Sequence, residues 1–234
     1  MALRQNRLTP RSLLYLVMTP LLFICCSREQ PKSAEQHEPK PASAPSPAPT
    51  TPDNRPVIVA FGDSLTAGFG AEPGESYPDF LQKDLDQRGA GYRIVNAGVS
   101  GDTTTDGLER VQTVIALKPA IVIVEFGGND GLRGLPVSTT RANLDQVITA
   151  LRKAGAKIVL AGMTLPPNYG PDYIHSFEAV YRDLAKQYRL PLIPFLLSGV
   201  GGNPALMQRD GIHPTGEGNR EVAQNVMKTL APLL

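Results

Sequence analysis

A serine and a histidine that lie far apart in the sequence have the residue types that nucleophilic catalysis needs. Ser64 lies just past a short apolar run, and His213 is preceded by Asp210 at a spacing of three residues. A serine hydroxyl is a weak nucleophile until a base takes its proton, and a carboxylate on the other ring nitrogen can orient that base. Ser64, His213 and Asp210 therefore form a candidate catalytic triad, provided that the fold brings them together.

Each of these residues also has an ordinary structural explanation. Ser64 could cap the helix that begins there, and Asp210 could cap a segment that carries a surface His213. His175, with Asp172 three residues before it, is a weaker competitor for the role of base. The three residue types alone leave these alternatives open.

Two glycine-containing turns could supply hydrogen-bond donors to the same site. Gly98 follows an apolar run, and its N–H could face a substrate with no side chain in the way. Gly127 and Gly128 end another run, and Asn129 after them could point its amide N–H at a developing oxyanion. Plain turns are the alternative at both places.

The elements that must position these residues alternate between strand and helix. Apolar runs predict five strands, at residues 57–61, 93–97, 121–126, 157–161 and 192–195. Pro194 in the last run indicates a sheet edge. Helical patterns separate the runs, at residues 78–88, 108–117, 140–154, 173–188 and 217–230. The alternation predicts an α/β fold, a three-layer αβα sandwich with a five-stranded, mostly parallel, flavodoxin-like sheet, whose site lies at the carboxyl ends of the strands.

The N-terminal segment has the pattern of an export signal. Three arginines in the first eleven residues precede an apolar run over residues 12–24, which ends at Cys25 and Cys26. The run is shorter than the roughly 20 residues of a spanning helix. We interpret residues 1–26 as a signal peptide of the bacterial lipoprotein type, with Cys26 as the lipidated residue. This predicts a membrane-anchored protein of the periplasm or cell envelope, with a cleaved soluble form and an uncleaved anchor as alternatives.

Residues 27–56 are predicted to be a disordered tether. They hold eight of the chain's 22 prolines and almost no large apolar residue, so they cannot bury enough surface to offset the entropy of ordering. The folded domain then covers residues 57–234, and it contains no cysteine for a disulfide, a thiolate metal site or a nucleophile. The net charge of +1 gives no reason to expect a nucleic-acid partner.

Four sequence blocks, in chain order, resemble those of the SGNH (GDSL) hydrolases. They are Gly62-Asp63-Ser64-Leu65, Gly98, Gly128-Asn129-Asp130 and Asp210-Gly211-Ile212-His213. The chain is most similar to the bacterial arylesterase, thioesterase I and lysophospholipase L1 group, and the resemblance covers almost all of the folded domain.

The resemblance implies a serine esterase that acts on aryl, acyl or thio esters of small molecules or lipids. Ser64 would attack the carbonyl carbon, and His213, oriented by Asp210, would move the proton from the serine to the leaving group. The Ser64 N–H, the Gly98 N–H and the Asn129 side chain would form the oxyanion hole. Neither a metal nor an organic cofactor is implied, and the oligomeric state is not indicated.

The stretch over residues 165–170 resembles the loop that lines the acyl groove in this group. Pro166, Asn168 and Tyr169 are therefore candidate substrate contacts, with a rigid surface connection as the alternative. The chain carries no insertion long enough for a lid, so we expect an open groove that tolerates several esters.

Two other functions use the same residues differently. A sugar or polysaccharide O-acetyl esterase would need the same triad. A flavodoxin-like phosphate- or nucleotide-binding module could use the turn at residues 64–68 as an anion cradle, but it leaves Asp210 and His213 unexplained. A phosphatase with Asp63 as nucleophile is a weaker alternative, because Leu65 stands where such enzymes carry a second aspartate.

Overall fold

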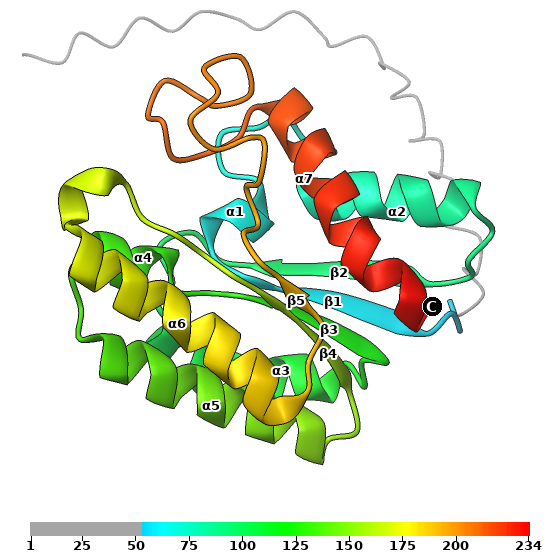
Figure 1. Ribbon diagram of the computed structural model, residues 1–234. Helices are drawn as coiled ribbons and strands as arrows, with labels where there is room; N and C mark the ends of the chain where they lie inside the picture. Colours follow the sequence, from blue (N-terminus) through cyan, green and yellow to red (C-terminus); the bar gives the residue numbers. More distant parts are fainter. Residues whose placement is uncertain (1–52) are drawn as a thin grey trace, which may run out of the picture. The chain divides into compact units, whose positions relative to one another are not determined.

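The structure is a computed structural model that describes residues 53–234 of the chain (Figure 1). The predicted signal peptide, the predicted lipidation site Cys26 and the tether up to residue 52 lie outside the described residues. They remain predictions.

Five parallel strands form a single sheet with the order β2-β1-β3-β4-β5. Their bounds are β1 (Val57–Gly62), β2 (Arg93–Gly98), β3 (Ile121–Glu125), β4 (Lys157–Ala161) and β5 (Leu192–Ile193). β1 and β3 are buried along their whole length, as expected of central strands that are covered on both faces. This is the strand order of flavodoxin-like folds, and it confirms the predicted fold class.

Helices cover both faces of the sheet, which gives the predicted three layers (Figure 1). One face carries α2 (Tyr77–Gln87) and α7 (Gly216–Leu230). The other carries α3 (Thr104–Ala116), α5 (Val137–Lys153) and α6 (Pro171–Tyr188). The short elements are α1 (Ser64–Ala67), α4 (Gly128–Leu132) and the 3₁₀ turns η1 (Pro167–Tyr169) and η2 (Ala231–Leu233).

The predicted element boundaries shift where side chains fix the ends. α3 begins at Thr104, earlier than the apolar pattern indicates, because Thr103 and Asp106 form a capping box there. β5 lies at the sheet edge as predicted, but it ends at Ile193, because Pro194 has no N–H to continue the ladder.

The strand order reverses at β1, which has β2 on one side and β3 on the other. The register pairs Gly62 with Gly98 on β2 and with Glu125 on β3, so the three carboxyl ends lie side by side. Doubly wound sheets bind ligands at such a reversal point. α1 and α4 start directly after β1 and β3, so Ser64 and Asn129 are delivered to this edge.

Candidate active site

The structure brings the predicted nucleophile, base and orienting acid together. Ser64 Oγ lies 2.9 Å from His213 Nε2, and His213 Nδ1 lies 2.6 Å from Asp210 Oδ2. The tautomer that satisfies both contacts has its proton on Nδ1, donated to the carboxylate, which leaves Nε2 free to accept the serine proton. The histidine in contact with Ser64 is His213, whereas His175 is exposed on α6, so the structure favours His213 as the candidate base.

Asp210 is fixed by the backbone of the turn that it orients. Its Oδ1 accepts hydrogen bonds from the N–H groups of Ile212, at 2.9 Å, and His213, at 3.1 Å. Partial burial alone would raise the pKa of Asp210, but the hydrogen bonds from the His213 side chain and from these N–H groups outweigh it and lower the pKa to about 2. Asp210 is therefore ionised at neutral pH and can stabilise an imidazolium.

The nucleophile stands on a tight turn between β1 and α1. Asp63 is the cap of α1, with its Oδ1 accepting from the Leu65 N–H at 3.0 Å, and Gly68 ends the helix with φ of 77°. The alternative in which Ser64 itself caps the helix is therefore wrong. Among the residues that the structure describes, no group accepts a hydrogen bond from the Ser64 N–H, so this donor is available to a substrate.

Asn129 faces the nucleophile turn from the first turn of α4. Its Nδ2 donates to Asp102 O at 2.9 Å and to Asp63 Oδ2 at 3.2 Å. Gly127, with φ of 112°, makes the sharp exit from β3 that aims α4 at the sheet edge. Asp63 and Asp102 hold the loops around the triad through Asn129 and Arg110. Asp130 does the same for the start of α3 by accepting from the Thr104 N–H and hydroxyl.

The prediction for Gly98 needs correction. Its N–H donates to Asn96 Oδ1 at 2.9 Å, so in this structure it is not free to face a substrate. A Cβ at this position would overlap the backbone of Ala67 and Thr66. A glycine is required at residue 98 because β2 approaches α1 closely, which the turn pattern could not distinguish from a donor role.

Arg110 ties the loops of the site together, a role that no sequence pattern indicates. Its guanidinium donates to Gly62 O at 2.7 Å and to Ala97 O at 2.8 Å, and it forms a 2.6 Å ion pair with Asp102. It thereby links the carboxyl ends of β1 and β2 to the loop that holds Asn129. No spacing pattern could have indicated this role, because two of the acceptors are backbone carbonyls.

A pair of buried carboxyl groups behind Ser64 was also missed. Glu125 Oε2 accepts from the Asp63 N–H at 3.2 Å and from Thr66 Oγ1 at 2.7 Å, and both acids are almost fully buried. Burial raises the pKa of Asp63 to about 6. Burial and the neighbouring Asp63 raise the pKa of Glu125 well above its usual range. The sequence does contain one signal of this pair, because Glu125 is an acid at the end of an otherwise β-branched strand.

This acid pair predicts a pH-dependent stability. A carboxyl with a raised folded pKa keeps its proton where the unfolded chain has lost it, so stability falls as the pH rises from about 4 through about 6. For Asp63 alone the loss is at most about 3 kcal/mol. We expect a higher Tm at pH 5 than at pH 7.5. Asp63→Asn should flatten this dependence, and the exposed control Asp172→Asn should not; equal slopes for the two variants would contradict the assignment.

The predicted groove residues lie beside α4. Pro166 and Asn168 are exposed, and the half-buried Tyr169 donates its hydroxyl to Leu132 O at 2.8 Å, at the end of α4. The loop that carries them is therefore attached to the helix that carries Asn129. Contact with a substrate stays a proposal.

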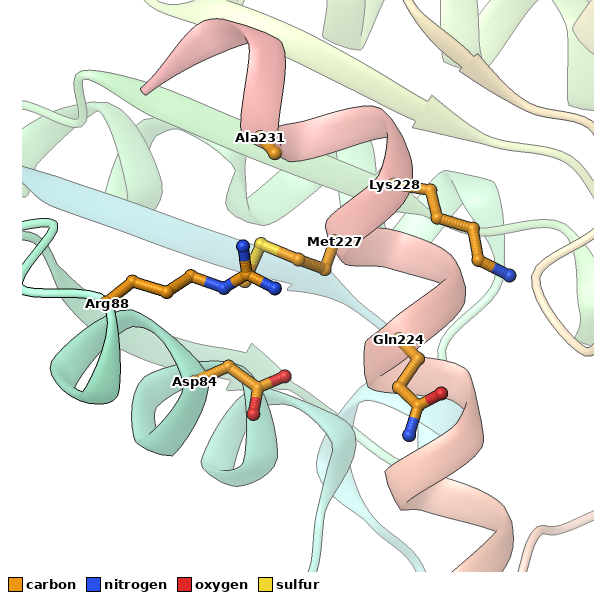
Figure 2. A pocket seen from close by; sticks show the side chains of 6 residues that line it. All are labelled: Asp84, Arg88, Gln224, Met227, Lys228 and Ala231. Carbon is orange, nitrogen blue, oxygen red and sulfur yellow. The ribbon is translucent and has the colours of Figure 1, made fainter.

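A recess of about 480 Å³ lies elsewhere, between α2 and α7 (Figure 2). It is lined by Asp84, Arg88, Gln224, Met227, Lys228 and Ala231, and it contains no residue of the triad. Within residues 53–234, no group of three or more His, Cys, Asp or Glu side chains is placed to hold a metal ion. No helix in the same range is long and apolar enough to cross a membrane.

Residues 60–221 match the GDSL-like lipase/acylhydrolase family, a span that contains the serine, the asparagine, the aspartate and the histidine described above. This chain belongs to that family. The chain is similar to the esterase TesA of Pseudomonas aeruginosa, with 45% identity over 179 residues, 76% of this chain and 89% of that protein. The thioesterase 1/protease 1/lysophospholipase L1 of Escherichia coli is 38% identical over 76% of this chain and 85% of its own.

Solved structures of the family agree with the fold. The crystal structure of TesA, 45% identical, superimposes with a TM-score of 0.74 over 76% of this chain and 99% of its own. A further sequence relative, an arylesterase of Vibrio mimicus, is 36% identical over 74% of this chain and 87% of that protein. The chain is therefore an ester hydrolase of the GDSL-like family, and the anion-cradle and phosphatase alternatives are not favoured.

Proposed function

We propose that this family member hydrolyses carboxylic esters through an acyl-enzyme on Ser64. The observation that carries the proposal is the 2.9 Å contact between Ser64 Oγ and His213 Nε2, with Asp210 2.6 Å behind the ring. A hydroxyl and an imidazole at this distance can exchange a proton as the oxygen attacks.

The reaction has two halves that use the same groups. Ser64 Oγ bonds to the carbonyl carbon while its proton moves to His213 Nε2. The bond to the leaving alcohol or thiol then breaks, and the leaving atom takes that proton. Water attacks the acyl group in the second half, gives a proton to His213, and releases the acid as the proton returns to Ser64 Oγ.

The negative charge on the former carbonyl oxygen requires donors at the same edge of the sheet. The Ser64 N–H is one of them. Asn129 Nδ2 is a second, and to reach the oxyanion it would exchange its longer contact, the one to Asp63 Oδ2 at 3.2 Å, while it keeps the one to Asp102 O. For the third we propose Gly101 in place of Gly98, because no described residue accepts a hydrogen bond from its N–H and no other atom lies within 4 Å of where its Cβ would be. Its loop contacts Asn129 through the carbonyl of Asp102.

Loss of the Asn129 amide should slow the chemical step. We expect Asn129→Ala to lower kcat about 10²–10³-fold, since one oxyanion donor typically contributes that much. KM should change little, because the donor acts on charge that develops only in the transition state. Steady-state kinetics on a p-nitrophenyl ester measure both constants, with Asn225→Ala on α7 as the matched control. A drop confined to KM would contradict the role.

The surroundings of the triad favour an ester with apolar parts. Among residues 53–234, Phe69, Val99 and Ile212 belong to the few exposed large hydrophobic residues, at 52, 46 and 41% exposure. Val99 lies near the nucleophile, because its N–H donates to Gly62 O at 3.1 Å. Phe69 and Ile212 lie beside His213, since the Phe69 ring centroid is 4.7 Å from the imidazole and Ile212 precedes it in the chain. Together with the loop of Pro166, Asn168 and Tyr169, they support an open groove for aryl, acyl or thio esters.

A panel of p-nitrophenyl esters, acyl-CoA thioesters and acetylated sugars tests this substrate class. We expect turnover of several p-nitrophenyl esters and of at least one thioester. Turnover of acetylated sugars alone would favour the O-acetyl esterase alternative. No turnover of any ester would contradict the proposed function.

We also propose export and a lipid anchor at Cys26. The support is the sequence pattern of the first 26 residues and a relative, 29% identical over 68% of this chain, that is named an uncharacterized lipoprotein of Bacillus subtilis. Palmitate labelling in a bacterial host should mark the wild-type protein and the control Cys25→Ala, but not Cys26→Ala. Labelling of Cys26→Ala would contradict this assignment.

A further inference from the structure

One side chain joins the segment after the nucleophile to the segment after the base. Gln208 Nε2 donates to Phe69 O at 2.7 Å and to Pro214 O at 2.8 Å. Phe69 is separated from Gln208 by 139 residues in the sequence, whereas Pro214 directly follows His213. The two hydrogens of a single amide are therefore shared between the two halves of the catalytic site.

The Phe69 and Pro214 carbonyls each belong to a residue that is directly linked to a member of the triad, Phe69 by a hydrogen bond to Ser64 and Pro214 by the peptide bond to His213. On the nucleophile side, the Phe69 N–H donates to Ser64 O at 3.0 Å, and the Phe69 ring packs on the imidazole of His213. On the base side, the Gln208 N–H donates to His213 O at 2.8 Å, and the Gly211 N–H donates to Gln208 O at 3.0 Å. Gln208 thus closes the turn that carries the base and binds that turn to the loop that follows Ser64.

The chain leaves space for this amide. Gly70, with φ of 72°, lies against Gln208, and a Cβ there would overlap Gln208 Oε1. A residue with a side chain would therefore both strain the backbone and displace the amide. The loop after α1 is shaped to accept Gln208.

We propose that Gln208 is a positioning residue that sets the approach of His213 to Ser64 by donating to the carbonyls of Phe69 and Pro214. The inference rests on the proposed function, in which Ser64 and His213 exchange a proton. Gln208 touches neither the substrate nor the reacting atoms. Its effect comes through the alignment of the two groups, and a misplacement of about 1 Å in a catalytic geometry can cost on the order of 10²-fold in rate.

Three unbranched replacements separate the donor role from packing. Gln208→Glu keeps the shape but places a carboxylate against two carbonyl oxygens. Gln208→Met fills the same space without a polar donor, and Gln208→Lys restores donors on a chain of similar reach. If the donors matter, kcat should follow the order wild type, Lys, Met, Glu. If Gln208 only fills space, Met should equal or exceed Lys.

The test measures kcat, KM and Tm on a p-nitrophenyl ester for the three variants and for the exposed control Gln224→Met. We expect Gln208→Met to lose about 10- to 100-fold in kcat. KM should stay within about threefold, and Gln208→Lys should recover part of the kcat loss. A kcat for Met within twofold of wild type, or a Met variant at least as active as Lys, would overturn the proposal.

Folding and the proposed function are controlled separately. If Gln208→Met does not fold, the Lys and Glu variants carry the comparison, and failure of all three to fold would show a structural role and contradict the proposal. A wild-type protein that hydrolyses no ester would refute the proposed function itself. An active wild-type protein with the wrong order of variants would refute only the role of Gln208.

Discussion

Replacing Ser64 with alanine is expected to lower kcat on a p-nitrophenyl ester by about 10⁴–10⁶-fold. The variant loses the atom that attacks the carbonyl, while Asp63 still caps α1 and the backbone donors stay in place. The loss should therefore appear in kcat, with a small effect on Tm. Initial rates measured at enzyme concentrations high enough to see the residual activity check this expectation.

The matched control is Ser138→Ala, because Ser138 is an exposed serine in the first turn of α5. It should keep wild-type kcat and KM. A Ser64→Ala protein that retains more than about a tenth of wild-type kcat would contradict the assignment of the nucleophile, because another group would then have to attack the carbonyl carbon.

Replacing Asp210 with asparagine is expected to lower kcat about 10⁴-fold, because the amide favours the wrong histidine tautomer and no longer stabilises the imidazolium. The carboxylate lies 2.6 Å from His213 Nδ1, and its pKa of about 2 keeps it charged at working pH. The asparagine Oδ1 can still accept from the Ile212 and His213 N–H groups, so the turn should keep its shape.

The control for this prediction is Asp172→Asn, which changes the exposed acid that stands three residues before His175. It should leave kcat unchanged. If instead Asp172→Asn were the damaging change, the base would lie on α6 and the geometry at His213 would have no catalytic meaning.

The fold could be predicted from the sequence because the central strands are short β-branched runs, and the long helices α2, α3, α5, α6 and α7 each have a clear apolar face. The contact of Ser64, His213 and Asp210 could be predicted because the chemistry of a triad requires particular residue types near the ends of such elements. Both depend on local pattern and on the rule that parallel strands share one carboxyl edge.

Other parts of the site could not be predicted because they depend on tertiary contacts. Arg110 and Gln208 act on backbone carbonyls, and any long polar side chain at those positions would look alike in the sequence. Gly98 ends β2 and Gly101 lies in the turn that follows, and only the three-dimensional path of the backbone shows that the N–H of Gly98 is already bonded. The burial of Glu125 beside Asp63 likewise follows from strand register.

Ser64 should become covalently modified during turnover with the help of His213. A p-nitrophenyl phosphonate can trap this modification, because a serine nucleophile displaces p-nitrophenol and keeps the phosphonyl group, and mass spectrometry then locates the adduct. We predict one equivalent of label on the peptide that contains Ser64, none on that peptide in Ser64→Ala, and much slower labelling in His213→Ala. Label on another residue, or labelling of Ser64→Ala at the wild-type rate, would contradict the assignment of Ser64 as the nucleophile.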